Sequence, residues 1–164
     1  MSSTELKHDF QTPFGVMRAI VIEDALRSFT FPKDDKKEED AHAIFKKLEE
    51  ELAAYFMGEL KEWSVPLAPI GTDFQQKIWK LLLTVKIGST LSYLELSKLY
   101  GDEKAIRAVA TANGANPICI LIPCHRIIGS DGSLTGYAWG IEMKKELLQL
   151  EQKFSDKVDL FSAL

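Results

Sequence analysis

Apolar and polar residues alternate along two stretches near the N-terminus, residues 6–14 and 16–22. Alternation with a period of two is typical of strands that bury one face. The turn-forming residues Thr12–Gly15 lie where the two stretches meet, so the pattern predicts a β-hairpin. Residues 25–31 show the same alternation and are expected to form a third strand.

The period changes to that of a helix after residue 40. The charges at 33–40 predict a solvated loop, and Pro66 and Pro69 predict an extended linker after the helix. We therefore expect an N-terminal α/β domain over residues 1–64, a linker over 65–71 and a second domain over 72–164. The helix is expected over 41–60, ending near Gly58, with an inward face of Ile44, Leu48, Leu52, Tyr55 and Phe56.

Two capping boxes mark helix starts in the second half of the chain. Thr72–Gln75 is expected to begin a helix that runs to about Val85. Ser92–Glu95 is expected to begin a shorter helix that Gly101 stops. The inward residues of the first of these helices are expected to be Phe74, Ile78, Trp79 and Leu82.

A third helix of this half is expected from Glu103 to about Asn113, with Asp102 as its N-cap and Gly114 at its end. Together with the helix over 93–100 it forms a helix-turn-helix candidate, although any small helical bundle gives the same pattern. A final amphipathic helix is expected over 140–154. Its inward residues are expected to be Ile141, Leu147, Leu148 and Leu150.

Length and charge limit the classes of protein to consider. The 164 residues suffice for one ordinary domain, or for a small domain joined to a medium one. No apolar run approaches the length of a membrane span and residues 1–10 are charged, so we expect a cytoplasmic protein, or a nuclear one in a eukaryote. Nine basic and 14 acidic residues precede position 72, whereas 11 basic and 10 acidic residues follow. Only the second half can therefore face a polyanion, with modest and salt-sensitive affinity.

The strongest chemical signal is the sequence Pro123-Cys124-His125-Arg126, which sets a thiol beside an imidazole. It follows an apolar run at 118–122 that we expect to be a short buried strand or extended segment, which Pro123 ends. A neighbouring base or a helix N-terminus activates a cysteine by favouring its thiolate. The alternative is a cysteine that packs as a small hydrophobe, which is what we expect of Cys119. The spacing of Cys119 and Cys124 suits neither a disulfide framework nor a zinc site.

Residues 71–151 resemble the active-site domain of the O6-alkylguanine-DNA alkyltransferases, or methylated-DNA–protein-cysteine methyltransferases. The resemblance implies an α+β fold, in which a small, ribonuclease-H-like α/β domain precedes a mainly helical domain. The helical domain carries the helix-turn-helix and the active-site cysteine. The matching segments, in chain order, are Gly71–Gln75, Ser92–Tyr93, Arg107–Val109, Asn116–Pro117, Ile122–Arg126, Gly136–Tyr137 and Lys144–Glu151.

The resemblance implies direct repair of O6-alkylguanine, and of O4-alkylthymine as a further substrate, in double-stranded DNA. Cys124 would accept the alkyl group, while His125 would take the thiol proton through a water and Glu151 would orient the imidazole. Tyr93 would supply a proton or hydrogen bond to the departing guanine. A thioether has no ready leaving reaction, so each molecule is expected to act once.

The resemblance also implies contacts with the base and the duplex. Asn116 would brace the turn before the site, and backbone groups of Cys124, Ile127 and Ala138 would read the base. Tyr137 and Trp139 would narrow the alkyl pocket, so that methyl is accepted better than benzyl. The helix-turn-helix would enter the minor groove and extrude the base. The residues expected to contact DNA are Ser92, Arg107, Ala108, Ala110, Thr111 and Arg126.

Other interpretations remain open at this point. Taken alone, Glu151 fits a solvated carboxylate, Tyr93 a packed aromatic and Arg107 an exposed base. For the whole chain, the alternatives are a non-catalytic protein that binds alkylation lesions and recruits other repair, and a Cys-His hydrolase. Relatives of the first kind usually replace the cysteine, and the second lacks an evident oxyanion-hole motif. We expect a monomer without cofactor or metal, with cooperative binding to DNA left open.

Overall fold

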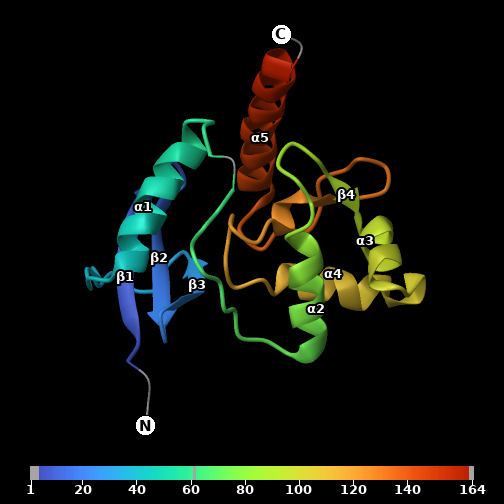
Figure 1. The fold of residues 1–164 in the computed structure, drawn as a ribbon. Coiled ribbons are helices and arrows are strands. Elements are labelled where there is room, and N and C mark those ends of the chain that lie inside the picture. The colour runs from blue at the N-terminus through green and yellow to red at the C-terminus, as the bar shows by residue number, and fades with distance from the viewer. Residues whose placement is uncertain (1–3, 61, 163–164) are drawn as a thin grey trace. The chain divides into compact units, whose positions relative to one another are not determined.

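The computed structural model describes residues 4–60 and 62–162, which fall into two compact units (Figure 1). The first unit contains the chain up to Ile70 together with Pro117–Leu121. The second contains Gly71–Asn116 and the chain from Ile122 onward. The first unit thus borrows five residues from the middle of the second half of the sequence.

The first unit is built on a three-stranded antiparallel sheet of order β1-β2-β3. The strands are β1 (Leu6–Thr12), β2 (Gly15–Ile22) and β3 (Ala25–Thr30), and Phe10 pairs with Met17 in the predicted hairpin. Glu23 and Asp24 join β2 to β3 with positive φ values of 52° and 59°, which matches the right-handed twist of the paired strands. The hairpin and the third strand are as predicted.

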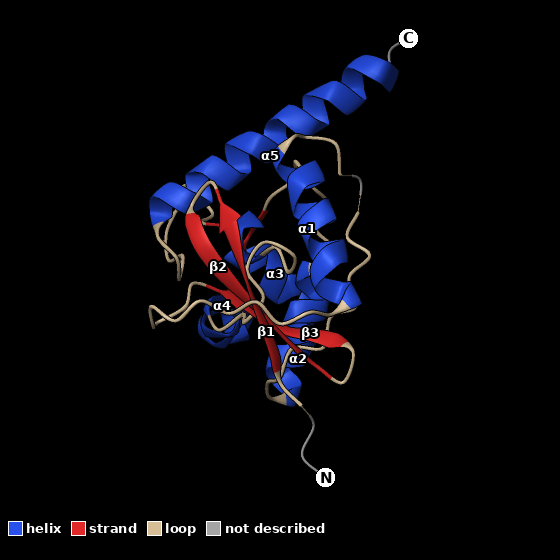
Figure 2. Cartoon of the chain, turned by 90° about the vertical axis from the view of Figure 1, so that its left-hand side faces the viewer, coloured by secondary structure: helices blue, strands red, loops and turns tan. Residues whose placement is uncertain are grey.

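Helix α1 (Ala43–Phe56) lies beside this sheet (Figure 2). The ring of Phe45 stacks on His8 and lies near Phe10, so the helix packs on the sheet through this side chain. The helix is shorter than predicted because His42, through its ring nitrogen, accepts from the amide of Ile44 and caps the N-terminus. Its buried residues are Ile44, Phe45, Leu48, Leu52 and Tyr55.

Two segments predicted to be solvated or linking are bonded to the edges of the sheet. Glu38 and Asp40 exchange backbone hydrogen bonds with β1, at 2.9 Å each. On the opposite edge, Leu26 exchanges two hydrogen bonds of 2.8 Å with Pro66 and Ala68. Because these two segments cover the edges of the sheet, β1 and β3 cannot pair there with another chain.

The run at 118–122 is not a strand, although it is buried as predicted. Phe29 of β3 donates to the carbonyl of Pro117 and accepts from the amide of Cys119, each at 2.9 Å, so pairing is confined to an isolated bridge at Ile118. Ile120 then adopts a φ of 73°, a left-handed conformation in which a β-branched residue cannot continue an extended ladder.

The second unit is mainly helical, with one short parallel strand pair. Both predicted capping boxes are present, at Thr72 and Ser92, and Gly101 ends its helix in the left-handed conformation with φ of 103°. In chain order the elements are α2 (Asp73–Leu82), β4 (Leu91–Ser92), α3 (Tyr93–Tyr100), η1 (Glu103–Ala105), α4 (Ile106–Gly114), η2 (Cys124–Arg126), β5 (Ile127–Ile128) and α5 (Ile141–Ser162).

Helices α2, α3 and α4 pack on one another, and the indole of Trp79 donates to the carbonyl of Ala112 at 2.9 Å. Helix α5 is longer than predicted, and its inward face differs in part. Leu147 is buried as predicted, whereas Ile141 is 39% exposed and the unpredicted Met143 and Phe154 are buried. Within the described ranges, none of the helices combines the length and the apolar character needed to cross a bilayer.

Candidate active site

Cys124 opens the short helix η2 and is held by two asparagines from the end of α4. Asn116 donates through its amide to the carbonyl of Ile122 at 2.8 Å and to the sulfur of Cys124 at 3.2 Å. Asn113 donates to the carbonyl of Cys124 at 3.3 Å. Asn116 therefore braces the turn as expected, and it also touches the sulfur directly.

The thiol of Cys124 is only 2% exposed, and its surroundings keep it protonated at neutral pH. Burial raises the pKa of the thiol to about 11, although the hydrogen bond from Asn116 and the nearby Lys144 ammonium act in the opposite direction. The sequence had suggested that neighbouring groups produce a thiolate at rest. They do not, because burial outweighs them. A nearby base must accept the proton when the sulfur reacts.

His125 is the candidate for that base, and its Nε2 lies 2.7 Å from Oε2 of Glu151. Both side chains are buried, and Glu151 comes from α5. A carboxylate accepts hydrogen bonds, so the proton of the neutral imidazole is fixed on Nε2 and Nδ1 presents a lone pair. Among the described residues, Nδ1 is a buried nitrogen without a protein hydrogen-bond partner.

Arg126 is part of the same buried cluster, which corrects the expectation that it contacts DNA. The residue is 7% exposed, and its Nε and Nη2 donate to the two carboxylate oxygens of Glu151 at 2.7 and 3.0 Å. Its Nη1 donates to the carbonyl of Val85 at 2.6 Å. Burial by itself would raise the pKa of Glu151, but His125 and Arg126 outweigh it and hold the value at about 2.

Tyr93 and Lys144 meet at the carbonyl of Thr135. The hydroxyl of Tyr93 and Nζ of Lys144 each donate to that oxygen at 3.1 Å, and Lys144 also donates to the carbonyl of Ile127 at 2.6 Å. Burial lowers the pKa of Lys144 and raises that of Tyr93. Sequence reasoning missed Lys144 because a lysine is expected at the surface. A signal was present, because Lys144 stands seven residues before Glu151, on the same face of a helix.

Apart from Asn116, the residues expected to line the base and alkyl pocket lie in β5 and in the segment that joins it to α5. The rings of Tyr137 and Trp139 make an edge contact, with centroids 5.4 Å apart. Tyr137 and Ile127 are buried, Trp139 is half-buried and Ala138 is exposed. Gly136 has a φ of 63°, and a Cβ there would lie 3.7 Å from the hydroxyl of Tyr93, so the chain passes closely over that group.

The face expected to meet DNA is the exposed side of α4. Arg107, Ala108 and Thr111 are exposed there, and Ala110 is half-buried. Ser92 is different, since it is 8% exposed and its hydroxyl accepts from the amide of Glu95 at 3.0 Å. We therefore replace its predicted contact with DNA by a role in capping α3.

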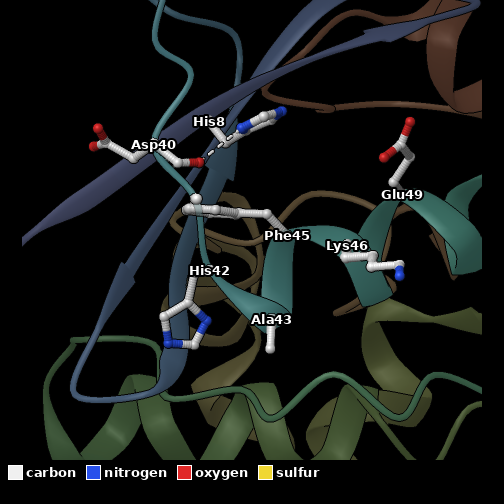
Figure 3. Close-up of a pocket in the computed structure, with 8 residues that line it drawn as sticks. His8, Asp40, His42, Ala43, Phe45, Lys46 and Glu49 are labelled. Carbon is white, nitrogen blue, oxygen red and sulfur yellow. Dashed lines mark hydrogen bonds between the residues drawn. The ribbon is translucent and has the colours of Figure 1, made fainter.

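Another hollow lies in the first unit, beside the N-terminus of α1 (Figure 3). The imidazole of His8 lies 2.9 Å from the carbonyl of Asp40, and the imidazole of His42 pairs with Asp24 and caps α1. Both rings thus make bonds that hold the fold. Within the described ranges, no group of three or more His, Cys, Asp or Glu residues is arranged to hold a metal ion.

Comparisons with known proteins agree with this geometry. Residues 73–153 match the family model described as the 6-O-methylguanine DNA methyltransferase, DNA binding domain. The methylated-DNA–protein-cysteine methyltransferase of Methanosarcina acetivorans is 43% identical over 148 residues, which are 87% of this chain and 95% of that protein. The chain belongs to the O6-methylguanine DNA methyltransferase family.

Crystal structures of this family extend the similarity to the fold. The O6-methylguanine methyltransferase of Mycobacterium tuberculosis has a TM-score of 0.82 and 40% identity, covering 92% of this chain and 94% of that one. The same organism's OGT in complex with DNA has a TM-score of 0.83 and 41% identity, covering 90% and 93% of the two chains. The α+β fold and the family inferred from the sequence are confirmed.

As a member of the O6-methylguanine DNA methyltransferase family, the chain brings four of its predicted site residues into one buried cluster. Cys124, His125 and Glu151 lie together with Asn116. The structure adds Lys144 and Asn113, and it moves Arg126 from the DNA surface into the cluster. The individual roles of these residues stay predictions.

Proposed function

We propose that this protein repairs DNA by transferring the alkyl group of O6-alkylguanine to the sulfur of its own Cys124, once per molecule. The observation that carries the proposal is the buried cluster in a chain of this family: a protonated thiol lies beside an imidazole that Glu151 orients. A soft sulfur nucleophile suits displacement at an alkyl carbon. The other predicted substrate, O4-alkylthymine, presents the same type of bond.

The proposed reaction is a single displacement with one proton transfer on each side. His125 takes the thiol proton on Nδ1, directly or through a water, and the thiolate attacks the alkyl carbon. The sulfur–carbon bond forms as the carbon–O6 bond breaks, and the electron pair leaves with the guanine. Tyr93 gives this base a proton or a hydrogen bond, and the Lys144 ammonium favours the thiolate because it is a nearby positive charge.

The base must leave the duplex to reach a buried sulfur. We assign this step to α4, whose exposed Ala108 and half-buried Ala110 permit close approach to the minor groove. Arg107 would fill the space that the extruded nucleotide leaves in the duplex, and Thr111 would contact the DNA backbone. One copy of the protein on double-stranded DNA suffices for this chemistry, since one chain supplies every proposed catalytic group.

The size of the pocket should favour small adducts. Tyr137 and Trp139 form one wall through their edge contact, which supports a preference for methyl over benzyl. The backbone groups of Cys124, Ile127 and Ala138 are proposed to read the edges of guanine. The carbonyl of Cys124 already accepts hydrogen bonds from the side chain of Asn113 and the amide of Ile127, and the carbonyl of Ile127 accepts one from Lys144. Contacts with the base must therefore share these oxygens or use amide groups of the same segment.

Mass spectrometry of the intact protein tests the proposal. After incubation with duplex DNA that bears O6-methylguanine, we expect one methyl group in place of one hydrogen on the wild type and none on Cys124→Ala. Cys119→Ala is the matched control, because it removes the other buried cysteine and should be methylated like the wild type.

The other outcomes separate the competing functions. Binding to the lesion without any gain of mass would identify a protein that only recognises damage. Repeated turnover of an ester or peptide substrate by an unmodified protein would identify a hydrolase. Either result would overturn the proposed transfer.

A further inference from the structure

We propose that Arg126 is a positioning residue that keeps His125 uncharged, and therefore able to act as a base, by sharing the carboxylate of Glu151. The inference rests on the proposed function and assigns a role to the arginine that the structure places in the buried cluster. It starts from the carboxylate of Glu151, which accepts hydrogen bonds from the side chains of His125 and Arg126.

The geometry divides the carboxylate unequally. Oε1 of Glu151 accepts from Nε of Arg126 at 2.7 Å, whereas Oε2 accepts from Nη2 of Arg126 at 3.0 Å and from Nε2 of His125 at 2.7 Å. The guanidinium thus makes a bidentate contact with both oxygens, and the imidazole shares Oε2 with it. Nη1 is anchored on the carbonyl of Val85, so the guanidinium has a fixed place.

The charges of the cluster follow from this arrangement. An arginine remains protonated in proteins, so Arg126 and an ionised Glu151 already make a neutral pair. A proton on His125 would add a net positive charge to a buried site, which is unfavourable. Without Arg126, the carboxylate would have His125 as its counter-ion, and the imidazole would bind a proton at rest. An imidazolium cannot take the proton of the Cys124 thiol.

The other groups around His125 do not replace this effect. Lys144 is a further positive group, and Cys124 and Tyr93 are held in their neutral forms by burial. Helix α2 also packs on η2, and its charged side chains are exposed. The titratable and charged groups that face the cluster are Glu151 and Lys144 from α5, Cys124 and Arg126 from η2, and Tyr93 from α3. The exposed charged groups of α2 are Asp73, Lys77 and Lys80.

The test is the pH profile of methyl transfer in single-turnover experiments. In Arg126→Met we expect the acid limb of the profile to move upward by about one pH unit or more, because His125 holds its proton longer. At pH values below the wild-type limb the rate then falls about tenfold or more, and it recovers at alkaline pH. Arg126→Lys keeps the positive charge and should keep the wild-type limb. In Arg126→Met/Glu151→Gln both charges are gone, and the limb should return toward its wild-type position.

Imidazole 15N spectra of the wild type give a second measurement that needs no variant. The chain has three histidines, so the signal of His125 is readily assigned with His125→Gln. We expect a neutral ring with its proton on Nε2 at neutral pH. An imidazolium there would overturn the inference, even if Arg126→Met did not fold.

The remaining outcomes also decide between explanations. An equal loss of rate at every pH in Arg126→Met, or an Arg126→Lys profile that moves like that of Arg126→Met, would show that Arg126 only supports the fold. Failure of the wild type to accept a methyl group would overturn the proposed function instead, which keeps the two failures apart.

Discussion

Cys124 combines a reactive position with an unreactive resting state. The sulfur is buried and the pKa of the thiol is raised to about 11. Asn116 nevertheless donates a hydrogen bond to the sulfur, and His125 is the next residue in the chain. A substrate base that enters the site brings its alkyl carbon to the sulfur, whereas a reagent in solution meets a protonated and shielded thiol. Selectivity for damaged DNA therefore begins with the thiol itself.

Iodoacetamide should accordingly modify native Cys124 slowly. We expect Cys119→Ala, which leaves a single cysteine, to be alkylated at neutral pH at least about a hundredfold more slowly than the same protein in denaturant, because the thiolate fraction is lower by that factor before shielding is counted. The measurement is the mass of the protein over time. Rapid stoichiometric labelling of the native protein would contradict the raised pKa.

Residue types alone could identify some members of this site but not others. Cys124, His125 and Glu151 were predictable, because a thiol next to an imidazole is rare and the family pattern supplied the carboxylate. Arg126 was misassigned, since an arginine beside an active site in a DNA-binding protein looks like a phosphate contact. Only the fold reveals that Glu151 and the carbonyl of Val85 surround its guanidinium.

At the level of elements, the caps determine where the helices begin and end. Thr72 and Ser92 each accept from the amide three residues later, and Gln75 and Glu95 complete the two boxes. Helix α3 is short, so its cap stabilises a large share of its hydrogen bonds. It also carries Tyr93 at its first position, where loss of the cap would loosen the proposed proton donor.

Replacing the cap of α3 should lower stability. Ser92→Ala is expected to reduce the free energy of unfolding by about 1 kcal/mol, since it leaves the amide of Glu95 without its acceptor. For a chain of this size the melting temperature falls by roughly 2–4 °C. Ser89→Ala, in the exposed turn before the helix, is the control and should melt like the wild type in calorimetry. If both variants melt alike, the capping role is wrong.

The starts of α2 and α3 were predictable because capping residues act locally, whereas α4 begins at Ile106, three residues after the predicted Glu103. The segment at 118–122 was not, because an apolar run indicates burial and says nothing about backbone direction. The positive φ of Ile120 and the single bridge to Phe29 depend on contacts with β3, which is about ninety residues earlier in the chain. The full length of α5 was missed for a related reason, because no capping residue marks the end of its apolar face.

For the whole molecule, stability should depend on pH through the buried ions. The pKa of Glu151 is about 2 in the folded protein against an ordinary value of 4.5, so the carboxylate favours folding fully above pH 4.5. That contribution, up to about 3 kcal/mol, is lost progressively as the pH falls from 4.5 through 2, because both states are protonated only below the folded pKa.

Urea unfolding at a series of pH values measures this loss. Glu151→Gln should be less stable than the wild type at neutral pH and should lose less stability between pH 4.5 and 2. Glu146→Gln removes an exposed carboxylate from the same helix and should follow the wild-type curve. Parallel curves for Glu151→Gln and the wild type would exclude this carboxylate as the cause.

The five residues that the first unit takes from 117–121 have a consequence for the order of assembly. Both backbone groups of Phe29 are satisfied there, and Ile118, Cys119 and Ile120 are buried. A ribosome releases the sheet long before it synthesises this insert, so the nascent sheet stays incomplete until some ninety later residues have emerged. Splitting the gene after Ile70 would leave the N-terminal half without this insert, which the C-terminal half encodes.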